Sequence, residues 1–152
     1  MDRQNQKTLY LDICTLCRPF DDQSLMRIRL ETDAYYLILQ ALQDAKYRMV
    51  VSPVHIEEAN AISDVEERQE ILSILDELGT AAECDMAATR TRAEYLHSRK
   101  IGIADAAHVA FAEATSDAFI TCDDRLVRKC RREKVGVTTV NPVEFTIAED
   151  LK

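Results

Sequence analysis

The chain has 152 residues, 47 % of them hydrophobic, which suits one compact domain and argues against a disordered protein. The low numbers of glycine and proline, three of each, favour long regular elements, and no apolar run approaches the roughly 20 residues that a membrane-spanning helix needs. The formal net charge of −8 at first disfavours a nucleic-acid partner, yet residues 125–134 hold six basic residues against one acidic residue, so the overall charge excludes little.

Short apolar segments alternate along the chain with longer segments of helical periodicity. In chain order, we expect a strand at 9–14, a helix at 24–45, a strand at 48–52, helices at 53–62, 65–78 and 84–99, a small-residue helix at 103–115, a strand at 117–121, a basic helix at 123–134, a strand at 135–140 and a short helix from 141. This alternation predicts an α/β fold of three layers, in which helices cover both faces of a mostly parallel sheet. Because no repeat or linker interrupts the pattern, residues 1–152 are expected to form a single domain.

Four acidic residues occupy equivalent places relative to these elements. Asp12 lies near the end of the first predicted strand, and Asp123 follows "FIT" at the end of a later one. Glu58 lies in the helix entered after "VVSP", and Asp105 lies in the first turn of a helix. Because ligands of parallel sheets gather beyond the carboxyl ends of the strands, we expect the four carboxylates at one edge. Such a group suits Mg²⁺ or Mn²⁺, which can activate water for attack on a phosphodiester, and a cation would explain why Asp12 stands among apolar residues.

Each acid also has a purely structural interpretation. An isolated Asp after a strand is most often a helix cap, which applies to Asp123 and to its neighbour Asp124. Asp105 is favoured in a first helical turn by the helix dipole, and Glu57 and Glu58 could be a solvated pair. The sequence leaves open which member of each adjacent acidic pair would be the ligand.

Four segments together resemble a known family: "YLDICTLCRPFDD", "SPVHIEEA", "IGIADAAHVAFA" and "FITCDDRL". They are similar to the PIN domain, the metal-dependent ribonuclease fold that includes VapC-type toxins of bacterial toxin–antitoxin pairs. The resemblance implies an RNA substrate, an antitoxin partner and Mg²⁺ or Mn²⁺ as cofactor. It also implies that the catalytic and metal-binding residues are Asp12, Glu58, Asp105 and Asp123. Where the family often has Asn or Ser two residues after the first acid, this chain has Cys14, a poor partner for a hard cation, and the hydroxyl of Thr15 could take over that role.

Several residues near the predicted site could contact an RNA substrate. They are Thr15, Arg18, Arg125, Arg128 and Lys129. The last three share one face of the basic helix, which could equally be an ordinary solvated face, and Arg18 could instead pair with Asp21 or Asp22. His108, three residues after Asp105, could orient a carboxylate or be an ordinary buried histidine.

Cys14 and Cys17 form a Cys-x-x-Cys pattern, which is typical of thiol redox proteins. The other cysteines offer no second close pair for structural zinc, and the odd total of five fits a reducing compartment. Since the polar N-terminus resembles no secretory signal, we expect a cytoplasmic protein.

Three functions therefore remain open from the sequence. The first is a metal-dependent endoribonuclease, and the second is a PIN-like binding module whose degraded metal site leaves it to act through protein or RNA partners. The third is a thiol redox protein that uses Cys14 and Cys17. In addition, the apolar segment "AYYLILQAL" could belong to the core or form half of a homodimer interface.

Overall fold

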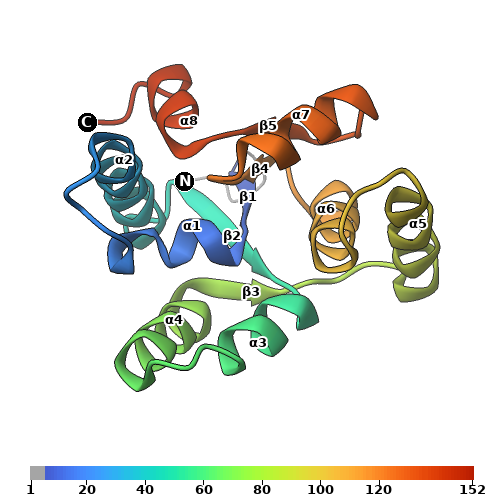
Figure 1. Cartoon of the computed structure of the whole chain (residues 1–152), viewed down its shortest axis with the longest axis horizontal. Helices are drawn as coiled ribbons and strands as arrows, with labels where there is room; N and C mark the ends of the chain where they lie inside the picture. Colours follow the sequence, from blue (N-terminus) through green and yellow to red (C-terminus); the bar gives the residue numbers. More distant parts are fainter. Residues whose placement is uncertain (1–5) are drawn as a thin grey trace.

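A parallel sheet lies at the centre of the computed structural model, which describes residues 6–152 (Figure 1). Its strands are β1 (Lys7–Leu11), β2 (Tyr47–Val51), β3 (Gly79–Ala81), β4 (Ala118–Ile120) and β5 (Thr138–Val140). The order across the sheet is β3-β2-β1-β4-β5, and Leu9 of the central strand pairs with Met49 on one side and Ala118 on the other. The chain builds outward from β1 to β3 and then crosses to β4, which puts the topological switch point between β1 and β4.

Helices supply the connections between the strands. They are α1 (Ile13–Leu16), the 3-10 helix η2 (Arg18–Phe20), α2 (Met26–Gln43), α3 (Pro53–Asn60), α4 (Val65–Leu78), α5 (Met86–Ser98), α6 (Ile103–Thr115), α7 (Asp124–Arg132) and α8 (Pro142–Ala148). In residues 6–152, every helix is too short or too polar to cross a membrane.

The central strand β1 contributes side chains to two hydrophobic cores, one on each face of the sheet. Leu9 and Leu11 point into the core that α2, α4 and α8 cover, where they meet residues such as Leu75. Tyr10, between them, points into the opposite core with Phe119, beneath α5, α6 and α7. In Figure 1, α2 and α8 lie to the left of the sheet and α5 and α6 to the right. The three-layer α/β/α fold predicted from the alternation of strands and helices is thus confirmed.

Local sequence signals explain where most helices begin and end. Asp64 caps α4 by accepting a hydrogen bond from the Glu67 backbone N–H at 2.9 Å, and Gly79 ends that helix. Pro53 occupies the first turn of α3, where its missing N–H costs nothing. The small-residue helix predicted at 103–115 has the same bounds in the structure.

Two local expectations were wrong. The first strand does not run to residue 14, because Asp12 ends it by capping α1, which begins at Ile13. The strand β3 was not predicted at all, since it has three residues and no apolar run. In the segment "AYYLILQAL", Tyr35 and Ile38 are buried whereas Tyr36 is half exposed, so core packing accounts for only one side of this helix.

Candidate active site

The four acids singled out in the sequence line a single cavity of about 430 Å³ beyond the carboxyl ends of β1 and β4. The cavity is lined by Asp12, Ile13, Cys14, Arg18, Glu58, Asp105, His108, Cys122 and Asp123. The neighbouring acids Glu57 and Asp124 do not line it: Glu57 is exposed, and Asp124 pairs with Arg27 at 2.7 Å. In each adjacent acidic pair, the residue that matches the family pattern, Glu58 or Asp123, is therefore the one that lines this cavity.

Asp12 is 5 % exposed, and both of its carboxylate oxygens accept hydrogen bonds. Its Oδ1 accepts from the Thr15 backbone N–H at 3.1 Å and from the Thr15 hydroxyl at 2.7 Å. Its Oδ2 accepts from the Thr121 hydroxyl at 2.5 Å, and the Cys14 thiol lies 3.1 Å from either oxygen. These donors stabilise the buried charge, so the burial of Asp12 does not by itself require a cation.

Asp105, unlike Asp12, accepts no hydrogen bond from the described residues. Its pKa is raised first by burial and then by the negative charges of Asp12 and Asp123, and no hydrogen-bond donor in residues 6–152 offsets these effects. Because it lies in the first turn of α6, the side chain is held near the other acids by the helix itself. Asp105 is thus the carboxylate whose ionised form gains most from a nearby cation.

Asp123 and Glu58 each have one oxygen engaged. Asp123 Oδ1 caps α7 by accepting from the backbone N–H groups of Arg125 at 2.9 Å and Leu126 at 3.2 Å. Glu58 Oε1 is in contact with Nε2 of His108, and this hydrogen bond lowers the pKa of Glu58. The helix-cap interpretation of Asp123 is correct for one oxygen, while the side chain also faces the cavity.

A comparison with protein-family models shows which family the chain belongs to. The sequence model described as the PIN domain matches residues 24–132. The chain belongs to the PIN domain family. The matched range contains Glu58, Asp105 and Asp123 but begins after Asp12.

Two solved structures share the PIN fold of this chain. The crystal structure of FitAcB from Neisseria gonorrhoeae has 19 % sequence identity and a TM-score of 0.52, over 88 % of this chain and 97 % of that chain. The crystal structure of PAE2754 from Pyrobaculum aerophilum has 12 % identity and a TM-score of 0.52, over 94 % of this chain and 88 % of that one. No curated protein matches the chain by sequence. At these identities, the likeness shows the fold alone.

PIN nucleases generally use divalent metal ions, so the cavity has to be judged as a metal site. Within residues 6–152, no three His, Cys, Asp or Glu side chains converge closely enough to form a ready-made site. The donors nevertheless suit a hard cation, because Mg²⁺ commonly binds through one or two carboxylates and keeps several waters. Asp105 and the second oxygen of Asp123 carry no hydrogen bond from the described residues, which makes them the most available ligands.

The thiols of the cavity region are poorly suited to redox chemistry. Burial, followed by a hydrogen bond to Glu67, raises the pKa of Cys17 to about 12. Desolvation and the charge of Asp12 raise the pKa of Cys14 further. Since the thiolate is the reactive form, both cysteines are less reactive than an ordinary exposed cysteine at neutral pH.

The residues expected to contact RNA do not all reach the cavity. Thr15 is fully buried and does not line the cavity, so the expected contact with a substrate is wrong, whereas its hydroxyl donates to Asp12 Oδ1 at 2.7 Å and thus supports that acid. Arg18 lines the cavity but also pairs with Asp21 at 3.0 Å and with the buried Glu31 at 2.9 Å.

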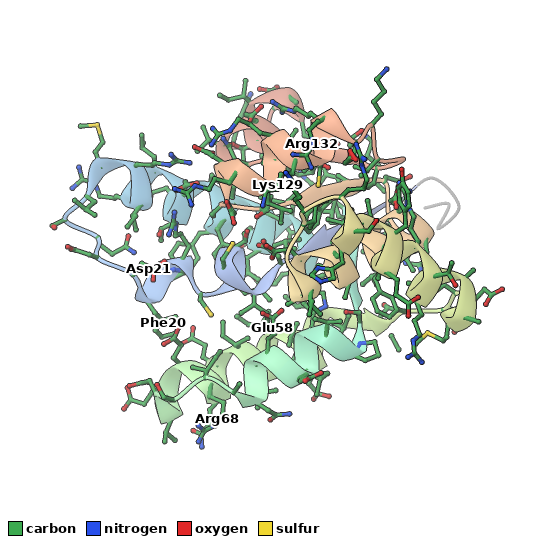
Figure 2. All side chains as sticks on the ribbon, turned by 45° about the vertical axis from the view of Figure 1, so that its right-hand side comes forward. Phe20, Asp21, Glu58, Arg68, Lys129 and Arg132 are labelled. Atoms are coloured by element: carbon green, nitrogen blue, oxygen red, sulfur yellow. The ribbon has the colours of Figure 1, made fainter. Side chains whose placement is uncertain are left out.

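Basic residues follow Asp123, a residue of the cavity, along α7. Arg125 and Arg128 are exposed and Lys129 is partly buried, and none of them forms an ion pair with the described part of the chain. In Figure 2, Lys129 and Arg132 lie along α7, above the level of Glu58 on α3, and Arg132 donates to the Arg99 carbonyl at 2.7 Å. The three unpaired cations of this helix, Arg125, Arg128 and Lys129, therefore remain available to a polyanion.

The buried polar groups next to the acids were not predicted from the sequence. Tyr10, Ser52 and His55 are buried and connect to His108. A tyrosine on a core strand normally signals packing alone. The one available hint was His55 at the third position of a helix that follows Ser52, where Glu or Gln of a capping box would stand.

Proposed function

We propose that this PIN domain is an Mg²⁺- or Mn²⁺-dependent endoribonuclease that hydrolyses RNA phosphodiester bonds. The observation that carries the proposal is that four acids from separate segments of the chain line one cavity. Membership of the PIN family supports it, since PIN domains are generally nucleases. The proposed catalytic and metal-binding residues are Asp12, Glu58, Asp105 and Asp123.

The acids contribute differently to this function. Asp105 and Asp123 each offer carboxylate oxygens that the protein leaves unpaired, whereas Asp12 is locked in place by Thr15 and Thr121. A bound divalent ion would lower the pKa of a water molecule and neutralise charge on the scissile phosphate. The protein's part is to hold negative charge in a fixed cavity that faces the substrate.

A second cavity, of about 520 Å³, supports a path for the RNA strand. It adjoins the acid cavity, with which it shares Arg18 and Asp123, and it runs between α2 and α7. Arg27, Arg125 and the apolar Leu25 also line it. Guanidinium groups suit phosphates and an apolar side chain suits a base or sugar, so we expect nucleotides next to the scissile bond to lie here.

Cleavage of labelled single-stranded RNA tests the proposal. We expect cleavage with Mg²⁺ or Mn²⁺, none with a chelator, and a loss of at least about a hundredfold in Asp105→Asn, because removing a ligand should cost no less than removing its outer-shell partner. Glu57→Gln is the matched control, since Glu57 is exposed and lies outside the cavity. Wild-type activity in Asp105→Asn, or cleavage that a chelator leaves unchanged, would refute the assignment.

The second candidate function is a binding module without catalytic activity. It is favoured by the absence of a ready-made cluster of three metal ligands in residues 6–152. The two functions differ in the response of the melting temperature to Mn²⁺, because a ligand that prefers the folded protein must stabilise it. A wild-type protein whose melting temperature Mn²⁺ does not change would favour the binding module.

We also propose an antitoxin protein as a partner, and a homodimer as the assembly that works in the cytoplasm. The toxin–antitoxin context of the family supports the partner, and the free cysteines support a reducing compartment. The apolar side chains of Met26 and Leu30 in the first turns of α2 are more than half exposed, which suits an interface. Light scattering of the wild type and of Leu30→Glu measures the mass: a dimer that the substitution dissociates would place the interface there.

A further inference from the structure

A chain of buried polar contacts begins at Glu58 and runs into the core. His108 on α6 contacts Glu58 Oε1 through Nε2 and the Tyr10 hydroxyl through Nδ1, the latter at 2.6 Å. The Tyr10 oxygen in turn lies 2.8 Å from Ser52 Oγ. Tyr10 and Ser52 are at most 1 % exposed and do not line the cavity, so this chain reaches the cavity only through Glu58 and His108.

The inner end of the chain is anchored to the backbone. The Ser52 N–H donates to Nδ1 of His55 at 3.0 Å, and Nε2 of His55 donates to the Leu11 carbonyl at 2.6 Å. Burial, and then the neighbouring His108, lower the pKa of His55 to about 4, which agrees with a neutral ring that donates once and accepts once. The chain therefore starts from a rigid strand end directly before Asp12.

Every polar side chain of this chain has a hydrogen-bond partner. An ionised carboxylate can only accept, so Nε2 of His108 donates to Glu58. Nδ1 of the same ring is hydrogen-bonded to the Tyr10 hydroxyl, which is in turn hydrogen-bonded to the Ser52 hydroxyl. Because each member is paired, the network restricts the orientations of its side chains.

We infer that His108 is a positioning residue for Glu58, with Tyr10 and Ser52 holding the His108 ring. Without the hydrogen bond from His108, the Glu58 side chain, which is 37 % exposed, would be free to populate several rotamers. With that hydrogen bond, Oε1 of Glu58 is occupied and Oε2 is the oxygen left for a ligand in the cavity. Asp105 stands one turn before His108 on α6, so the same helix presents a ligand and the residue that orients another. This inference rests on the proposed metal-dependent function.

Two substitutions of similar size separate orientation from packing. Gln at position 108 keeps an N–H donor near the place of Nε2, whereas Leu fills a similar volume without a donor. We expect His108→Leu to weaken Mn²⁺ binding, measured by calorimetry, and RNA cleavage by about ten- to a hundredfold, and His108→Gln to restore most of both. Tyr10→Phe, which removes a single hydroxyl from a fully buried ring, should weaken binding by about three- to tenfold. His97→Leu, at an exposed histidine outside the cavity, is the matched control and should bind as the wild type does.

The outcomes are distinct. Weak binding in His108→Leu with recovery in His108→Gln supports the positioning role. Equal binding in both variants, whether weak or undiminished, overturns it, because the hydrogen bond would then not matter. If His108→Leu does not fold, Tyr10→Phe decides: wild-type Mn²⁺ affinity in that variant overturns the role. A wild-type protein that binds no Mn²⁺ refutes the proposed function, and this inference with it.

Discussion

Replacing Asp12 tests whether its carboxylate holds the fold together in the absence of metal. In Asp12→Ala, α1 loses its N-cap, which typically costs about 0.5–2 kcal/mol. The buried Thr121 hydroxyl loses its acceptor, which adds about 1–3 kcal/mol, whereas the Thr15 hydroxyl can turn to the Ile120 carbonyl at 3.3 Å. The expected loss in the free energy of unfolding is therefore about 1.5–5 kcal/mol, or about 3–20 °C in melting temperature for a chain of this length.

Urea unfolding with a chelator present measures this loss, and Asp64→Ala provides the control. Asp64 also caps a helix, but it is exposed and accepts only from the Glu67 N–H among the described residues, so its removal should cost only the cap, about 0.5–2 kcal/mol. Asp12→Asn should lose little, because its amide keeps one oxygen for Thr15 and the Thr121 hydroxyl can rotate to accept from the NH₂ group. If Asp12→Ala were no less stable than Asp64→Ala, the hydrogen bond from Thr121 to Asp12 would not stabilise the fold.

Further outcomes follow from the same geometry. The pKa of Asp105 is raised from 3.8, so its ionisation costs folding stability as the pH rises through the folded pKa. With a chelator present, Asp105→Asn should therefore be more stable than the wild type at about pH 7 but not at about pH 3. An equal difference in stability at both pH values would contradict this. Mn²⁺ at about 100 times its Kd should stabilise the wild type by about 2.7 kcal/mol, or about 5–11 °C, and leave Asp105→Asn unchanged in a thermal scan. With its pKa at about 12, Cys17 should react slowly with iodoacetamide at neutral pH until urea unfolds the protein, and rapid labelling of the folded chain by mass spectrometry would be incompatible with that pKa. Arg128→Ala should reduce the salt dependence of RNA binding by about 0.7 in the slope of log K against log salt, whereas a phosphate-independent side chain would leave the slope unchanged.

The three-layer fold could be predicted because it follows from a local pattern, a short apolar strand followed by an amphipathic helix, that repeats along the chain. Alternating strands and amphipathic helices admit few arrangements other than a parallel sheet covered on both faces, and caps such as Asp64 and Asn141 mark the helix starts. The edge strand β3 was not predictable, because Gly79 and Ala81 are depleted in strands and Thr80 alone makes no pattern; the segment pairs because β2 lies beside it. Tertiary context, not sequence pattern, makes this segment a strand.

The acids of the site were predictable from position, but their environments were not. Rules about strand ends indicate that Asp12 and Asp123 share an edge, yet nothing in the sequence tells that Thr121, more than a hundred residues from Asp12, donates to it. The same holds for Tyr10 and His108, which meet across two elements. Contacts between distant segments depend on side-chain packing, which a single sequence does not reveal.

The hydrogen bonds that each acid accepts determine how much its carboxylate gains from a bound cation. A carboxylate that already accepts several protein donors gains less from a cation than one that accepts none, because part of its charge is already neutralised. Asp12 is saturated, Glu58 and Asp123 each keep one oxygen free, and Asp105 has no donor from the described residues. The cost of removing a charge should therefore be largest at Asp105 for metal binding and largest at Asp12 for folding. In this site Asp12, the most deeply buried acid, stabilises the edge of the sheet, and Asp105, whose pKa is raised by burial and by the neighbouring acids, is the one that gains most from a cation.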